Sequence, residues 1–577
     1  MKHFVVKRIF PLRIVSHEWR RVALFTLLIL IVTTLPYALA WAQQGDGWRF
    51  SGFLFGVEDG NSYLGKMRLG MRGEWNFYLF YTPERHRSEA LVVLPYIAAG
   101  RLAGLFVPES SPDSHAALVI AYHLMRLVCT TLLIAAMYLF IAQFLRARSR
   151  RLFALVLATL GGGFGWLLSL IGLGGWLGSL PPDMYVPEGF SFLIIFGLPH
   201  LALARAALLL GLALLIQSQR RDRRETQSEN RKNSLRSLRP LRLSVFAGVC
   251  WLVVGLAVPF YLAVIYAILG AWGLATWLRT RRFPGGLFWR CVVAGGLTLP
   301  LFGYNTFIFI INQAFAQWSA QNNLPSPHPL QYLAAYALLI VPALVGGVWV
   351  WRSLRLQARR RIAYALLIGW LVIVPILVYL PINVQRRLSE AVIVPLAILA
   401  TMGIRRLARR RRGQVAYLAV ASLTTAFLLF GATLAALSPR APLFRPAAEV
   451  AAFDWLNTQV SPNDVILAAV PTGNALPAFV RARTYMGHGP ETLDWPIKTD
   501  IVERFYRGTL SAAEFAALFD PPCRDSAGLC LLPVRYIFYG AAERALAPNG
   551  DQPPAWSVGM TQVYDEDGYQ IYAANPD

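Results

Sequence analysis

The chain has 577 residues, of which 56% are hydrophobic and only 15% charged, with a mean hydropathy of +0.46. Apolar runs close to 20 residues long recur between residues 22 and 437, and this length, which a bilayer crossing needs, excludes an ordinary soluble protein. The net charge of +24 does not indicate nucleic-acid binding, because the basic residues stand in short blocks between the apolar runs.

The basic blocks predict the orientation in the membrane, because cytoplasmic loops carry an excess of Lys and Arg. Four strongly basic loops are expected inside the cell: residues 219–242, 279–290, 352–361 and 405–412. Residues 438–577 contain 10 Lys and Arg against 16 Asp and Glu, a net charge of −6. The sequence therefore predicts a multi-pass protein of the cell (plasma) membrane with an extracytoplasmic C-terminal domain.

Residues 22–42 form the first expected span. Its end contains Ala38-Leu39-Ala40, which resembles a signal-peptidase site. The many spans that follow favour an uncleaved helix, and residue 43 emerges outside in either case.

The first outer loop is expected over residues 43–113. It includes a moderately apolar stretch, residues 88–107, that holds Pro95 and Arg101. If residues 88–107 crossed the membrane fully, the basic block 146–151 would lie outside the cell, against the positive-inside trend. An interfacial or re-entrant helix is therefore expected instead.

About eleven spans are expected in residues 1–437, the predicted transmembrane domain. After the first, they cover residues 116–145, 152–172, 192–216, 244–278 as a tight hairpin turning near Pro259, 292–311, 331–351, 362–380, 391–404 and 415–437. A second outer loop is expected at residues 173–190.

Residues 438–577 predict a small α/β domain. Residues 447–458 have helical periodicity, 465–470 and 534–539 predict strands, and the Asp-Gly turn within 562–572 predicts a hairpin. Cys523 and Cys530 are seven positions apart, and a disulfide between them is plausible outside the cell.

The first outer loop contains adjacent acids, Glu58 and Asp59, with Gly56 and Gly60 on either side. This pattern predicts a flexible carboxylate turn that deprotonates a hydroxyl or binds a divalent cation. The alternative is an ordinary solvated turn.

Two further clusters lie at expected outer ends of spans. Glu188 in the second outer loop and His200 beyond it, three helical turns away on a continuous helix, could face one cavity; the alternative for His200 is packing at a helix kink. Arg386 and Arg387 are the paired arginines expected at an outer face. A guanidinium pair there suits a phosphate, or else lipid headgroups.

Three features together resemble the GT-C superfamily of membrane glycosyltransferases, which includes protein O-mannosyltransferases, the lipid A aminoarabinose transferase and bacterial relatives. The first outer loop bears an acidic pair, Glu58-Asp59, and a short interfacial stretch follows it at 88–107. The spans end in a domain that opens with residues 453–457 and 461–467. The segment from Gln385 to Arg387, before residues 395–400, also resembles a late-span segment of bacterial members.

The resemblance implies an inverting glycosyltransferase that moves a sugar from a polyprenyl-phosphate donor to an acceptor at the outer membrane face. It implies Asp59 as the general base, with Glu58 supporting it or binding metal, and Arg386 and Arg387 as ligands of the donor phosphate.

The resemblance implies lesser roles for four more residues: Lys66 and Arg68 at the phosphate, and Glu188 and His200 in orienting the acceptor or a metal. It identifies no cofactor and leaves open a divalent metal such as Mg²⁺ or Mn²⁺. The acceptor is a glycan, a lipid or a protein. The rival hypotheses are a membrane transporter or lipid flippase, and a non-catalytic envelope assembly protein.

Overall fold

The computed structural model describes residues 14–86, 90–227, 234–353, 361–521, 529–547 and 554–574. The chain divides into two compact units. We call the first the helical unit; it comprises Met1–Thr34, Arg126–Tyr304 and Leu324–Gly431. We call the second the mixed unit, because it holds the strands together with several helices; it comprises Leu35–Met125, Asn305–Asn323 and Ala432–Asp577.

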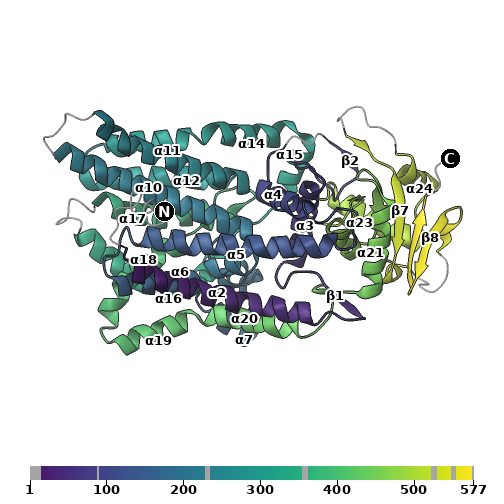
Figure 1. The fold of residues 1–577 in the computed structure, drawn as a ribbon, viewed down its shortest axis with the longest axis horizontal. Helices are drawn as coiled ribbons and strands as arrows, with labels where there is room; N and C mark the ends of the chain where they lie inside the picture. Colours follow the sequence, from purple (N-terminus) through teal and green to yellow (C-terminus); the bar gives the residue numbers. More distant parts are fainter. Residues whose placement is uncertain are drawn as a thin grey trace. The chain divides into compact units, whose positions relative to one another are not determined.

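Apolar helices, both long and short, build the helical unit (Figure 1). They are α2 (Ser16–Ala42), α5 (Ser114–Ile141), α6 (Arg148–Leu160), α7 (Gly165–Leu170), α9 (Ser191–Gly197), α10 (Pro199–Gln227), α11 (Ser234–Ala257), α12 (Tyr261–Thr280), α13 (Gly285–Gly296), α14 (Leu299–Ile311), α16 (Pro329–Ser353), α17 (Arg361–Leu377), α18 (Ile393–Leu407), α19 (Arg411–Ala421) and α20 (Leu423–Ala436). Four of them, α2, α5, α14 and α20, also have residues in the mixed unit. Every predicted span coincides with one or two of them. The expected hairpin near Pro259 is confirmed, because α11 ends at Ala257 and α12 begins at Tyr261.

Six helices in the described part of the chain are long and apolar enough to cross a membrane, or up to eight if each bent pair is one span. The bent pairs are α13 with α14, at 50°, and α19 with α20, at 43°. Two shorter apolar helices, Leu241–Ala257 and Ile362–Leu377, accompany them. The multi-pass membrane character agrees with the sequence analysis, while the count of eleven stays a prediction.

The break between α6 and α7 follows from three consecutive glycines, and a carboxylate satisfies the freed backbone. Oδ2 of Asp183 accepts hydrogen bonds from the N–H of Gly163 at 3.0 Å and of Gly165 at 3.2 Å. A Cβ on Gly163 would lie 2.2 Å from the carbonyl oxygen of Ala334. Only glycine permits this close approach, as expected for small residues between membrane helices.

The mixed unit contains a five-stranded sheet with the order β5-β4-β7-β9-β8, green to yellow in Figure 1. Its strands are β4 (Val465–Leu467), β5 (Arg483–Thr484), β7 (Val534–Tyr539), β8 (Thr561–Glu566) and β9 (Tyr569–Ala573). β4 pairs parallel with β5 and β7, and β9 pairs antiparallel with β7 and β8. The predicted hairpin is confirmed: Asp567 and Gly568, with φ of 48° and 77°, form its turn.

Five helices in the described residues accompany this sheet: α21 (Ala447–Gln459), α22 (Val470–Phe479), α23 (Trp495–Arg507), α24 (Ala512–Phe519) and the short α25 (Ala541–Arg544). The predicted helix 447–458 is therefore confirmed. The predicted strand 465–470 is shorter than expected, because α22 begins at Val470 with Pro471 in its first turn.

Two short strand pairs join the first predicted outer loop to the C-terminal segment within the mixed unit. β1 (Trp48–Phe50) pairs with β3 (Phe444–Pro446), and β2 (Glu84–Arg85) pairs with β6 (Cys530–Leu531). Cys530 is disulfide-bonded, and its predicted partner, Cys523, lies outside the described residues. The predicted boundary at residue 438 falls near the start of Ala432–Asp577, but Leu35–Met125 belongs to the same compact unit.

Helices α3 (Val57–Met71) and α4 (Leu94–Gly104) supply the rest of the first loop. They cross closely, because a Cβ on Gly70 would lie 1.9 Å from the carbonyl oxygen of Ile97, and one on Gly100 would lie 1.7 Å from that of Met67. The predicted helix within residues 88–107 is present as α4, and its place in a membrane interface stays a prediction.

Candidate active site

The acidic pair begins a helix instead of forming the expected flexible turn. Glu58 and Asp59 lie in the first turn of α3, after Gly56 in the left-handed conformation with a φ of 60°. Gly60 serves packing: a Cβ there would lie 2.4 Å from the ring of Phe53. Both acids therefore lie at a helix N-terminus, where the backbone N–H groups point toward them.

Asp59 contacts a histidine that the sequence analysis did not identify. Its Oδ1 lies 3.2 Å from Nε2 of His488. The imidazole is 8% exposed and the Asp59 side chain 57% exposed. The two residues are 429 positions apart, so no local pattern connects them. The available signal was a histidine among glycines and a proline in the segment Gly487 to Glu491.

Lys66 pairs with a second acid from the same segment. Its Nζ lies 2.6 Å from Oε1 of Glu491, and both side chains are about 95% buried. Oγ of Ser62 donates to the same oxygen at 2.9 Å. Burial alone raises the pKa of Glu491, but the charges of Lys66 and then His488 outweigh it, so the pKa lies below its ordinary value. Glu491 is therefore an ionised carboxylate behind His488.

Arg68 lies on another face of α3 and is fully buried. Its guanidinium donates to the carbonyl oxygens of Ala478 at 2.9 Å and Glu109 at 3.1 Å, and to Oγ of Ser114 at 3.2 Å. Burial lowers its pKa to about 10. These bonds join α3 to two other segments of the mixed unit, which is a structural task.

The segment that carries His488 is fixed by a side-chain oxygen. Oγ1 of Thr492 accepts from the N–H of Gly487 at 3.1 Å and of His488 at 3.3 Å. Gly487 packs directly on α22, because a Cβ there would lie 2.3 Å from the carbonyl carbon of Gly473. A side chain at either glycine would displace the segment.

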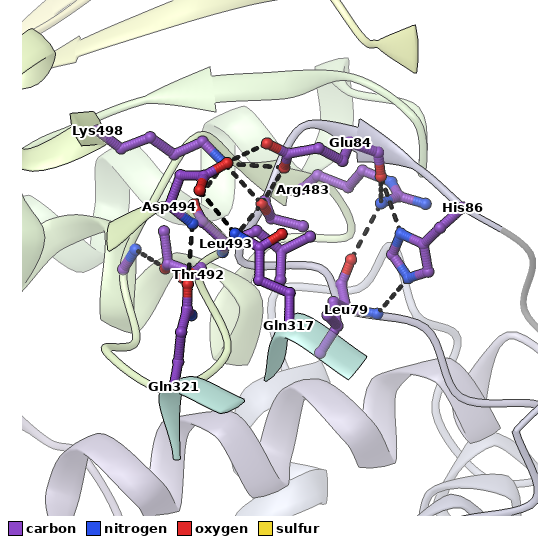
Figure 2. A network of polar contacts seen from close by, with 12 residues as sticks. Leu79, Glu84, His86, Gln317, Gln321, Arg483, Thr492, Leu493, Asp494 and Lys498 are labelled. Atoms are coloured by element: carbon purple, nitrogen blue, oxygen red, sulfur yellow. Dashed lines mark hydrogen bonds and ion pairs between the residues drawn. The ribbon is translucent and has the colours of Figure 1, made fainter. Parts of the chain in front are cut away.

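Helix α15 (Gln313–Gln321) holds the far end of the same segment through amide groups, which point toward it in Figure 2. Nε2 of Gln321 donates to the carbonyl oxygen of Thr492 at 2.8 Å, and Oε1 of Gln321 accepts from the N–H of Asp494 at 3.0 Å. Nε2 of Gln317 donates to Oδ1 of Asp494 at 2.6 Å. Asp494 has a φ of 54°, a strained conformation that these bonds help to hold.

A buried ion pair anchors the next turn of the chain (Figure 2). Nζ of Lys498 lies 2.6 Å from Oε1 of Glu84 and donates to Oγ1 of Thr82 and the carbonyl oxygen of Leu493, both at 2.8 Å. Every hydrogen of this ammonium group has an acceptor. The residues from 487 to 498 are thus fastened at both ends, which keeps His488 and Glu491 in place.

The helical unit has a polar cluster of its own at the start of α10. Arg205 donates to both carboxylate oxygens of Glu390, at 2.7 and 3.0 Å, and both side chains are 0% exposed. Arg205 also donates to the carbonyl oxygens of Pro187 and Glu188 and to Oγ of Ser191. The sequence analysis missed this pair, because Arg205 lies inside an apolar run.

Four residues with predicted ligand roles belong to the helical unit: Glu188, His200, Arg386 and Arg387. Nε of Arg387 is 3.5 Å from Oε1 of Glu188. The guanidinium of Arg386 lies over the ring of Tyr185, 5.2 Å from its centroid, and forms no ion pair with any side chain in the described part of the chain. His200 is half-buried in the first turn of α10. Glu188 and His200 do not lie on one continuous helix, because Leu198 separates α9 from α10, and their sharing of one cavity stays a prediction.

A divalent metal finds no ready cage among the described residues. No three His, Cys, Asp or Glu side chains come together there, and the acidic pair meets a single histidine. Mg²⁺ is often held by one or two carboxylates together with substrate phosphates, so a divalent metal at Glu58 and Asp59 stays a prediction.

No protein-family model and no curated protein matches the chain. Among solved structures it is similar to the oligosaccharyltransferase of the archaeon Archaeoglobus fulgidus. The apo form has 13% identity and a TM-score of 0.49, over 95% of this chain and 74% of that chain. The archaeal oligosaccharyltransferase AglB in complex with an inhibitory peptide and a dolichol-phosphate has 13% identity and a TM-score of 0.45, over 95% and 74%.

A third structure, of the complex with zinc and sulfate, has 14% identity and a TM-score of 0.45, over 94% of this chain and 73% of that chain. At these identities and TM-scores the matches assign neither a superfamily nor residue roles, so the expected GT-C glycosyltransferase and its O-mannosyltransferase and aminoarabinose transferase branches stay predictions.

Proposed function

We propose that the protein is an inverting membrane glycosyltransferase that uses a polyprenyl-phosphate sugar as donor. One observation carries the proposal: Asp59 offers a half-exposed carboxylate on the first turn of α3, with one oxygen held by a buried imidazole. An exposed carboxylate held in one orientation is what a general base needs, since an alcohol is a poor nucleophile until its proton is removed.

In the proposed reaction the acceptor hydroxyl gives its proton to Asp59 while its oxygen attacks the anomeric carbon. The bond between that carbon and the phosphate oxygen breaks, and its electron pair leaves with the phosphate. Attack from the face opposite the leaving group inverts the configuration. Phosphate leaves without a general acid, so cations are needed where its charge grows.

We assign that task to Arg386 and Arg387. Two guanidinium groups on adjacent residues suit a phosphate, because each presents a planar fork of donors. Glu188 engages Arg387 and limits its side-chain freedom before substrate arrives. The class of reaction is that of the oligosaccharyltransferases named above, one of which was solved with a dolichol-phosphate.

The proposal is tested in membranes that contain the overproduced protein, supplied with radiolabelled polyprenyl-phosphate sugars and extracted envelope acceptors. Label should move to acceptor in the wild type. The Asp59→Asn variant keeps the shape of the side chain and loses the base, so transfer should fall about 10²–10⁴-fold. Transfer at the wild-type rate in Asp59→Asn contradicts the assignment of the base.

A matched control is Glu58→Gln, which removes the neighbouring acid from the same helical turn. It should retain much more activity than Asp59→Asn. Failure of the wild type to transfer any of the sugars, together with movement of a labelled lipid across reconstituted vesicles, would instead support the transporter hypothesis.

A further inference from the structure

The imidazole of His488 is immobilised before it meets Asp59. Its backbone N–H and carbonyl both bond Thr492, at 3.3 and 2.8 Å. The ring of Tyr81 stacks on it, with centroids 5.5 Å apart and planes 29° from parallel. The ring therefore has one orientation available, with Nε2 toward Asp59.

The tautomer follows from the contacts of the two ring nitrogens. An ionised carboxylate only accepts hydrogen bonds, so Nε2 carries the hydrogen that bonds Oδ1 of Asp59. Nδ1 forms no hydrogen bond with any described residue and lies 4.0 Å from Oε1 of Glu491. The Glu491 carboxylate lies behind the ring, and Lys66 balances the charge of that carboxylate.

The backbone beside Asp59 is tied to the same support. Nδ2 of Asn474 donates to the carbonyl oxygen of Glu58 at 3.3 Å, and Nδ2 of Asn61 donates to Oδ1 of Asn474 at 2.8 Å. The hydroxyl of Tyr81 donates to the carbonyl oxygen of Asn474 at 2.8 Å. The start of α3 and the ring that stacks on His488 therefore share one anchor on α22.

We propose that His488 is a positioning residue for the transfer reaction, holding Oδ1 of Asp59 so that the carboxylate presents one orientation to the acceptor hydroxyl. This inference rests on the proposed function. The proton moves from the hydroxyl to Asp59 while the bond from Nε2 is kept, and Glu491 with Lys66 remains an ion pair. The C-terminal segment thus contributes to the geometry of a base that lies in the first loop.

The kinetic test compares two substitutions of the same residue. His488→Phe keeps the ring that stacks on Tyr81 and removes the donor, whereas His488→Gln places an amide N–H near the position of Nε2. In His488→Phe we expect kcat to fall about 10–100-fold with KM for the donor unchanged, because a misplaced group lowers the rate without weakening binding. His488→Gln should recover part of the loss.

The matched control is His115→Phe. The His115 ring stacks on Phe479 in the same unit, with centroids 3.7 Å apart, so its substitution also replaces an imidazole by a benzene ring. Transfer by this variant, corrected for the folded fraction, should equal that of the wild type. If His488 has a purely structural role, His488→Phe, like the control variant, should lose folded protein and keep kcat. That result would overturn the proposal.

A second readout needs no transfer activity. A water-soluble carbodiimide modifies protonated carboxyl groups, and mass spectrometry compares modification of Asp59 with that of Glu58 in the same peptide. Loss of the donor makes Asp59 easier to protonate, so its relative labelling should rise about fivefold in His488→Phe. It should not change in His115→Phe.

The two readouts separate failure of the inference from failure of the proposed function. If Asp59 is labelled faster in His488→Phe but the wild type transfers no sugar, the contact between His488 and Asp59 is established and the proposed reaction is wrong. Unchanged labelling and unchanged kcat in His488→Phe, in a protein that transfers sugar, overturn the inference alone. A lower kcat with unchanged labelling also overturns it, because His488 then acts by a route other than Asp59.

Discussion

Each unit contains an acid–base contact, and the two differ in how far water reaches them. Arg205 and Glu390 in the helical unit are both 0% exposed and share two hydrogen bonds. In the mixed unit His488 is buried, but the carboxylate of Asp59 is 57% exposed. In the fully buried pair, which we call the closed pair, both side chains bond only to other protein groups and hold helices together. In the half-exposed pair, the buried imidazole is held rigidly while the carboxylate stays accessible. The difference suggests which of two chemically similar contacts can act on a substrate.

The closed pair should give the largest effect when it is broken. Arg205→Met leaves Glu390 buried without its partner, and removing one member of a buried pair costs about 3–5 kcal/mol. We expect little folded protein after detergent extraction, measured by size-exclusion chromatography and thermal unfolding. The double variant Arg205→Met/Glu390→Met removes both charges and should recover most of the loss. A single variant as stable as the wild type would contradict this account.

Arg205 also shows where sequence reasoning reached its limit. The helices could be predicted because apolar runs of fixed length have few alternatives, and the hairpin at residues 567 and 568 because Asp-Gly favours the turn. The contact between Asp59 and His488 could not, since it depends on how α3 packs on α22. The turn expected at Glu58 was wrong because Gly60, which suggested flexibility, is required by the ring of Phe53.

Another buried acid, Glu543, extends the comparison, because it has no basic partner in the described part of the chain. Glu543 accepts from the N–H of Ala469 and of Gly540, both at 2.9 Å. Burial raises its pKa from 4.5 to about 7. Its stabilising contribution is therefore complete below pH 4.5 and is lost as the pH rises through 7, a change of about 3 kcal/mol.

The measurement is the thermal unfolding midpoint of the detergent-solubilised protein between pH 5 and pH 8. Glu543→Gln keeps the size of the side chain and does not titrate, so the fall in the midpoint over this range should become smaller. An identical pH dependence in the wild type and the variant would show that Glu543 is not the titrating group.

A smaller effect, on KM for the donor, is expected at the two arginines proposed to bind phosphate. The two differ because one of them already has an acidic partner. Glu188 holds Arg387, while the guanidinium group of Arg386 lies over the ring of Tyr185 and forms no ion pair with any described residue. Arg386→Ala should raise KM for the donor about tenfold, and Arg387→Ala should do so to a lesser degree. Lys at either position should restore only part of the donor affinity that Ala loses, because the lysine ammonium group lacks the planar fork of arginine. Equal KM values in the wild type and the double alanine variant would leave only contact with lipid headgroups.

The smallest effect is expected at an ion pair on the surface. Arg504 lies 2.9 Å from Asp500, whose side chain is 65% exposed. Water screens such a pair, so Asp500→Asn should leave the unfolding midpoint within experimental error of the wild type. A clear fall in the unfolding midpoint would show that the exposed fraction of an ion pair does not by itself tell whether the pair stabilises the fold.

The pairing of β1 with β3 and of β2 with β6 has a consequence for biosynthesis. The strands Trp48–Phe50 and Glu84–Arg85 leave the ribosome early, and their partners are made about 400 residues later. At about 5–20 residues per second, the first loop waits on the order of tens of seconds for its partner strands. During that delay its unpaired strand edges are open to chaperones and proteases. Residues 438–577 secreted alone would contain all five strands of the larger sheet but would lack the first-loop strands that pair with β3 and β6.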